Sequence, residues 1–239
     1  MKADFPPIAT LLFLATVAFL FVITILGLPR ALSKTRNPNY TSILYQVALG
    51  MIAWLTLLSV LSLKGFFFDY LALPPRVMLP VLTCFIFIFI LAISKKFGNL
   101  LMEFPAAWLI APQAFRIVVE IVLWQLHKNG NAPVQMSFEG LNFDILAGIS
   151  APIIAYMAFG NGRKNYTLAL VWNVISMALL INILTIAILS MPLIGAFDEP
   201  NTFVAYFPYI LLPGFVAPYA MMLHVMSIKQ LLKLRKARA

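Results

Sequence analysis

Charged residues are scarce in this sequence, and so are the side chains that build disulfides and zinc sites. Only 10% of its 239 residues are charged, against about 25% in soluble domains. The single cysteine, Cys84, excludes an intrachain disulfide. Two histidines and one cysteine are too few for a zinc site built from those ligands alone. We therefore expect neither a bound metal nor a cofactor.

Apolar residues dominate what is present. They make up 62% of the chain, and the mean hydropathy is +0.95, whereas soluble domains are about 45–50% apolar. This composition predicts an integral membrane protein. The first apolar run, Ile8–Leu28, is about 21 residues long, beyond the roughly 7–15 of a signal peptide, so we interpret it as an uncleaved span.

Seven runs approach the roughly 20 apolar residues that cross a bilayer. No second domain and no internal repeat is evident, so residues 1–239 are expected to form a single all-α domain of seven transmembrane helices. Membrane lipids are its expected partners, and the sequence does not define an oligomeric state. The predicted spans cover residues 8–28, 40–63, 77–94, 105–126, 137–159, 166–189 and 204–227.

The distribution of basic residues predicts the orientation. With seven spans, 12 Lys and Arg residues lie in loops on the side of the C-terminus and 4 on the other side. Without the fourth span the split is 10 against 7. Cytoplasmic loops are enriched in Lys and Arg, so we expect the N-terminus outside and the C-terminus in the cytoplasm. The net charge of +9 then reflects topology, and no nucleic-acid partner is expected.

The fourth span is unusual because it contains Gln113, Arg116 and Glu120. Their i, i+3, i+7 spacing places all three on one face of a helix. Arg116 would lie roughly 15 Å below the outer end, where a charge costs about 2.5–3.5 kcal/mol, so it should face the interior of the bundle.

The fifth span offers a partner face. It opens with SFEGLNFD, residues 137–144, and the helix can begin at Ser137 or at Asn142. We favour Ser137 as the cap, which places Asp144 about 10 Å deep and level with Glu120. A stripe of small residues that permits close helix packing follows on the same face: Gly148, Ala151 and Ala155.

Two carboxyls near one guanidinium would leave an excess negative charge in a dry site. A proton on Glu120 or Asp144 would remove that excess, because Arg116 stays protonated. These carboxyls are therefore candidates for proton exchange, and Asn173 of the sixth span is a further candidate for binding. The alternative is an Arg–carboxylate pair that only fixes helix packing.

Prolines interrupt the seventh span, which should kink or break there as helices at transporter binding sites do. His224, near the predicted inner end of this span, could relay protons, but we expect it to be an interfacial residue. The residues at the expected break are Pro208, Pro213, Gly214 and Pro218.

Two segments resemble an uncharacterised bacterial family of integral membrane proteins with seven spans. They are FRIVVEIVLW, residues 115–124, and MSFEGLNFDILAGISAP, residues 136–152. The resemblance brings no activity with it, but it implies a bacterial inner-membrane location. It also implies that one motif contains Arg116, Glu120, Glu139, Asn142 and Asp144.

The leading functional hypothesis is a small-solute or proton-linked transporter, or a seven-helix protein that binds a ligand. Arg116 would bind an anionic group or balance charge, and the carboxyls would exchange a proton or contact polar atoms of a ligand. One alternative is a lipid-modifying enzyme with the carboxyls as acid and base, so enzymatic activity stays open. Another is a structural or assembly subunit of a membrane complex.

Overall fold

The computed structural model describes residues 4–34 and 40–237. All regular secondary structure in these residues is helical. Lys2, Arg36 and Arg238, which enter the count of loop charges, lie outside the described residues. Eight α-helices lie in this part of the chain: α1 (Pro7–Lys34), α2 (Tyr40–Leu63), α3 (Met78–Ile93), α4 (Lys95–Leu100), α5 (Phe115–Lys128), α6 (Asp144–Phe159), α7 (Tyr166–Leu189) and α8 (Ala217–Lys236).

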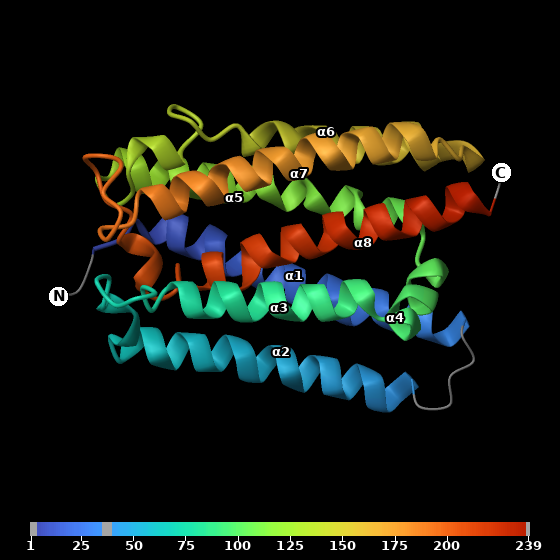
Figure 1. Ribbon diagram of the computed structural model, residues 1–239, viewed down its shortest axis with the longest axis horizontal. Coiled ribbons are helices and arrows are strands. Elements are labelled where there is room, and N and C mark those ends of the chain that lie inside the picture. Colours follow the sequence, from blue (N-terminus) through green and yellow to red (C-terminus); the bar gives the residue numbers. More distant parts are fainter. Residues whose placement is uncertain (1–3, 35–39, 238–239) are drawn as a thin grey trace.

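The long helices lie side by side in one bundle, and the two ends of the chain are at opposite ends of it (Figure 1). In the described part of the chain, six stretches are long and apolar enough to cross a membrane. A seventh results if α3 is joined across a 71° bend to the segment Lys95–Glu103, which contains α4. The expected spans 8–28, 40–63, 105–126 and 166–189 coincide closely with four of the six.

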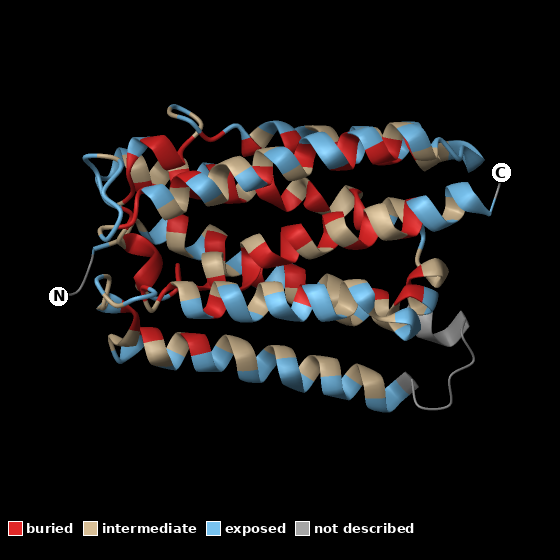
Figure 2. Ribbon diagram, viewed as in Figure 1, coloured by how far each residue is buried: buried red, intermediate tan, exposed pale blue. Residues whose placement is uncertain are grey.

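Apolar side chains cover the outside of the bundle. Leu11, Leu49 and Ile86 are each more than 60% exposed, while several polar side chains are fully buried. Figure 2 shows exposed residues along the outer faces of the helices. Water would penalise such a surface, and a hydrocarbon solvent would not. The arrangement is therefore consistent with an integral membrane protein.

The predicted start of the fifth span at Ser137 is wrong, because α6 begins at Asp144. The backbone between them turns instead: the N–H groups of Gly140 and Asn142 both donate to the carbonyl of Ser137, at 3.0 and 3.3 Å. The side-chain oxygen of Asn142 then accepts from the N–H of Asp144 at 3.0 Å. Asn142 thus satisfies a donor at the start of α6, as a helix cap does.

The last span is one helical stretch, Leu212–Lys236, and lies further along the chain than residues 204–227. Residues Leu212–Val216 form a π-helical turn, η8, and α8 runs on to Lys236. The carbonyl oxygen of Gly214 accepts from Trp54 Nε1 at 2.8 Å and from Cys84 Sγ at 3.2 Å. Pro218 has no N–H to donate to the carbonyl of Gly214 four residues earlier, so this carbonyl is free for α2 and α3. Pro218 does not interrupt α8, since it lies in the first turn.

Candidate functional site

An Arg–carboxylate pair lies at the centre of the bundle. Two short helices, η3 (Ala106–Leu109) and η4 (Ala111–Ala114), lead into α5, which carries Arg116 in its first turn. Asp144 is in the first turn of α6. The Nε and Nη2 atoms of Arg116 donate to the two carboxylate oxygens of Asp144. The residues are only 2% and 4% exposed, so this is a buried bidentate pair.

Close packing of α6 against α5 makes this pair possible. Gly148 lies one turn after Asp144, and a Cβ atom there would be 2.8 Å from the backbone nitrogen of Ile117. Ala151 and Ala155 continue the buried stripe along α6. Small residues therefore set the distance at which the carboxylate reaches the guanidinium.

Gly148→Ala is expected to lower the free energy of unfolding by about 1–3 kcal/mol, because the new methyl group meets backbone that cannot move aside easily. Gly50→Ala in α2 is the matched control, since nothing lies within 4 Å of a Cβ atom there. Denaturant titration in mixed micelles measures both. Equal stability of the two variants would contradict the proposed close approach of α5 and α6.

The remaining donors of Arg116 are also used. Its Nη1 atom donates to Ser176 Oγ at 2.8 Å and to Gln113 Oε1 at 3.2 Å, and lies 3.1 Å from His224 Nε2. Its Nη2 atom also donates to the carbonyl of Ser176, at 3.3 Å. Arg116 therefore holds four elements together, and an anionic ligand could bind it only by displacing one of these partners.

His224 contacts this network through both ring nitrogens. Its Nε2 lies 3.1 Å from Arg116 Nη1 and 3.3 Å from Ser176 Oγ. Its Nδ1 lies 3.0 Å from Asn173 Oδ1 and 3.2 Å from Gln113 Nε2. The side-chain nitrogen of Asn173 donates in turn to Ser227 Oγ at 3.0 Å. His224 therefore joins α8 to the polar residues before α5 and on α7.

Glu120 is held differently from Asp144. Both of its oxygens accept from Asn142 Nδ2, at 2.8 and 2.7 Å, and the residue is 2% exposed. Within the described part of the chain, no Lys, Arg or His side chain makes an ion pair with it. The charge of Arg116 is balanced by Asp144, so Glu120 has a neutral amide as its partner.

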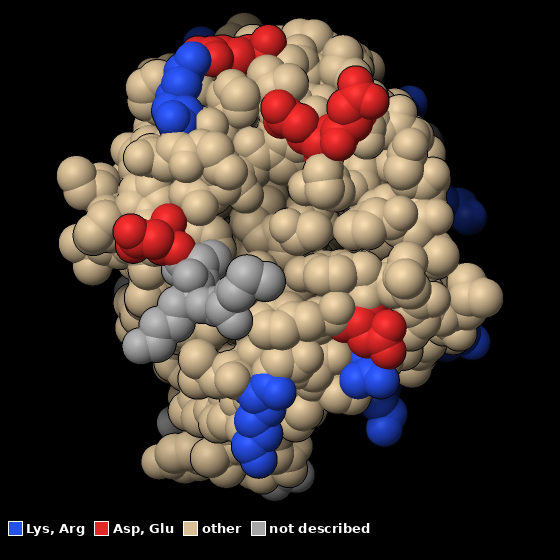
Figure 3. Space-filling view, turned by 90° about the vertical axis from the view of Figure 1, so that its left-hand side faces the viewer, with Lys and Arg blue, Asp and Glu red and all other residues tan. Residues whose placement is uncertain are grey.

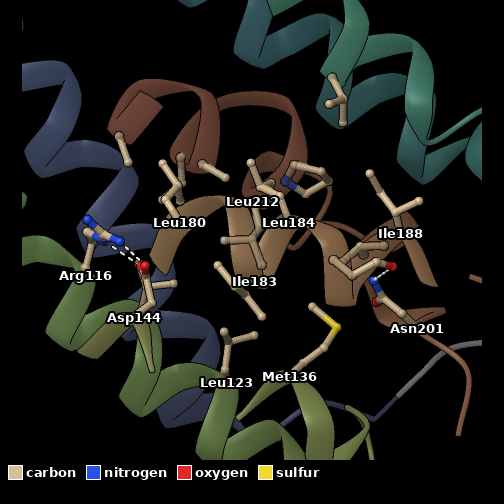
Figure 4. Close-up of a pocket in the computed structure, with 18 of the residues that line it drawn as sticks. Arg116, Leu123, Met136, Asp144, Leu180, Ile183, Leu184, Ile188, Asn201 and Leu212 are labelled. Carbon is tan, nitrogen blue, oxygen red and sulfur yellow. Dashed lines mark hydrogen bonds and ion pairs between the residues drawn. The ribbon is translucent and has the colours of Figure 1, made fainter. Parts of the chain in front are cut away.

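A cavity of about 90 Å³ extends from this cluster. It lies between α3, α5, α7 and the start of the last span, and Figure 4 shows Leu123, Leu180 and Ile183 lining its length. Arg116 and Asp144 lie at one end and Asn201 lies at the other (Figure 4), and Glu120 also lines the cavity. The wall between them is apolar, so the cavity should stay dry.

The structure gathers most of the predicted site residues into this centre. Glu139 is the exception: it lies at the surface, where its carboxylate accepts from Lys128 Nζ at 2.6 Å and Trp124 Nε1 at 2.8 Å. The bond from Lys128 holds the pKa of Glu139 below its usual range. Those that meet in the buried network are Gln113, Arg116, Glu120, Asn142, Asp144 and Asn173.

The sequence interpretation missed four polar residues of this region: Ser176, Asn201, His224 and Ser227. The prediction of an interfacial His224 is wrong, because its exposed fraction is 0%. Placing the end of the span at residue 227 put His224 near the membrane surface, whereas α8 continues to Lys236. The i, i+3 pairs Asn173/Ser176 and His224/Ser227 are the signal that could have revealed the network.

In the described residues, no group of three or more His, Cys, Asp or Glu side chains could hold a metal ion. The fold and the buried network therefore define a helical protein of the membrane class with a polar centre made of protein side chains. The chain belongs to the family described as "Domain of unknown function (DUF8737)", which matches residues 74–232. That segment contains the whole network and the cavity. No curated protein and no solved structure matches the chain.

Proposed function

We propose that this chain is a single-domain, proton-linked transporter of a bacterial inner membrane, with seven spans. Its N-terminus would lie outside and its C-terminus in the cytoplasm. Glu120 would be the group that binds and releases the proton. The cavity beside Glu120 would hold the transported ligand, and the π-helical start of the last span would form part of its wall.

The charge balance of the buried network carries this proposal. Arg116 and Asp144 neutralise each other, so an ionised Glu120 would leave one uncompensated negative charge in an apolar region. A protonated Glu120 removes that cost and can donate a hydrogen bond. Glu120 also lines the cavity. A ligand in the cavity would therefore contact the group that binds the proton.

The π-helical turn at the start of the last span supports a transporter over a packing role. Leu212, Pro213 and Val216, which belong to the π-helical turn η8, line the cavity. Single π-helical turns inside α-helices are frequent at functional sites. A pair that only fixed helix packing would require neither the cavity nor the π-helical turn.

The distribution of surface charge supports the orientation. The end of the bundle next to the N-terminus carries Asp4, Asp69, Glu139, Asp198 and Glu199 beside a few basic residues (Figure 3). The opposite end is strongly basic, as expected of a cytoplasmic face. Its described basic residues include Lys95, Lys96, Arg163, Lys164, Lys233, Arg235 and Lys236.

Proton flux into liposomes containing the purified protein tests the proposal. Under an imposed membrane potential, the interior of liposomes that contain wild type should acidify faster than that of empty liposomes, as a trapped pH-sensitive dye reports. Glu120→Gln should abolish the difference. The amide keeps the size of the side chain and cannot exchange a proton. Glu139→Gln is the matched control, and its flux should equal that of the wild type. Flux in Glu120→Gln equal to wild type, or none in wild type, would overturn the proposal.

A further inference from the structure

The end of the cavity remote from Arg116 presents a free hydrogen-bond acceptor. Asn201 lines the cavity and is 2% exposed. Its backbone N–H donates to the carbonyl of Ser190 at 2.7 Å, and its Nδ2 donates to that of Ala187 at 3.2 Å. Its Oδ1 is buried and has no partner in the described structure. Buried acceptors are normally paired, so this oxygen points to a donor that the protein does not supply.

The dimensions of the cavity restrict what can bind. Ser176 contacts Arg116 and Ala187 contacts Asn201, and these α7 residues are about 16 Å apart along the helix axis. The volume over this length is only about 90 Å³. An engineered cavity that binds one benzene molecule is larger, at about 150 Å³. A long, thin space of this kind suits part of one unbranched alkyl chain, not a fused ring system or a pair of acyl chains.

The chemistry around Asn201 restricts the head of such a ligand. The lining residues at this end, Met136, Ile188, Met191 and Val204, are apolar. A charged headgroup would be desolvated there without a counter-charge. A water molecule would have one polar side chain to bind, fewer than the 2–4 partners it needs. A neutral hydroxyl or N–H group can donate to Asn201 Oδ1 while its alkyl chain fills the apolar part.

The cavity also borders the lipid-facing surface. Met78 and Val81 of α3, and Leu184 and Ile188 of α7, line it and are half-buried. These side chains face the cavity on one side and the surrounding hydrocarbon on the other. A ligand dissolved in the bilayer could therefore enter between α3 and α7 without crossing water.

We propose that the cavity binds the alkyl chain of a single-chain lipid whose neutral hydroxyl or N–H group donates to Asn201 Oδ1. The carbons next to that group occupy the apolar space beside Asn201. This inference rests on the proposed function and names the class of ligand for the same cavity.

Photolabelling of the protein in lipid nanodiscs tests the inference. The probes are a long-chain primary alcohol with a diazirine on its chain, its methyl ether, and the matched N-alkyl acetamide. In wild type we expect the alcohol to label cavity residues on α7 about tenfold more than the ether, which corresponds to about 1.4 kcal/mol. Strong labelling by the acetamide would show that an N–H donor is accepted too, and weak labelling would restrict the ligand to hydroxyl donors.

Two variants test whether the labelling arises from a probe bound in the cavity at Asn201. Asn201→Leu should reduce it about tenfold because the acceptor is lost, and Ala187→Leu should block it by filling the cavity. Asn182→Leu, an α7 asparagine whose Nδ2 donates to the carbonyl of Leu141, is the control and should label normally. If Asn201→Leu does not elute as a folded protein, the comparison of alcohol with ether in wild type decides.

Equal labelling by alcohol and ether, or labelling outside the cavity, would overturn the inference. Photolabelling needs no proton movement, so it can succeed where the flux assay of Glu120→Gln fails. Conversely, Glu120-dependent flux without alcohol-specific labelling would keep the proton-linked transporter and reject this class of ligand.

Discussion

Arg116→Met should lower the free energy of unfolding by about 3–5 kcal/mol, because it leaves Asp144 as an unpaired charge in the interior. Gln113, Ser176 and His224 would each lose a hydrogen bond to the guanidinium as well. Methionine fills a similar volume without a polar head, so the loss measures the interactions and not a cavity. Unfolding by SDS in mixed micelles, followed by tryptophan fluorescence, gives the value.

Two further variants test whether this loss of stability comes from a buried ion pair. Arg76 pairs with Asp69 at 2.9 Å, with both side chains about 40% exposed, so Arg76→Met should cost less than about 1 kcal/mol. The double variant Arg116→Met/Asp144→Leu should recover most of the stability lost in Arg116→Met, since it removes both buried charges. A loss at Arg116 no greater than that at Arg76 would show that the Arg116 pair is not buried.

The central part of the site could be predicted because periodicity alone determines which residues share a helix face. Arg116 and Glu120 are one turn apart on α5, so their spacing places them together whatever the helix packs against. Gln113 joins them from the preceding 3-10 turn η4, which the expected single helix did not include. The cost of a charge in hydrocarbon then requires that face to point inward. The small-residue stripe after Asp144 identified the second helix for the same kind of local reason.

Features that depend on helix ends could not be predicted in the same way. Leu141 and Phe143 extend the apolar run upstream of Asp144, so hydropathy does not distinguish a helical turn from the loop observed there. Asn142 stops the helix because its side chain caps Asp144 and binds Glu120, and the second contact is tertiary. Asn201 belongs to the cavity through contacts with α7, and nothing in its neighbouring sequence marks it.

His224→Phe should be the second large loss, at about 1–3 kcal/mol for each buried group left without a partner. Phenylalanine keeps an aromatic ring beside Trp172, whose ring centroid is 5.6 Å from that of His224. It offers neither an acceptor to Arg116 nor a donor to Asn173, so both groups lose a hydrogen bond. His224→Asn keeps one donor and one acceptor and should retain part of the stability.

The same network predicts the protonation state of His224, and this result separates two roles for the ring. A second proton on Nε2 would place two positively charged donors, His224 and Arg116, 3.1 Å apart. The ring should therefore stay neutral while Arg116 remains paired with Asp144. Nitrogen-15 spectra of histidine-labelled protein measure the protonation state and the tautomer of the ring over a pH series. A doubly protonated ring near neutral pH would mean that the proton is carried at His224, and Glu120 would lose its assigned role. A neutral Nδ1–H ring would identify His224 as the acceptor that positions Arg116 and leave Glu120 as the exchanging group.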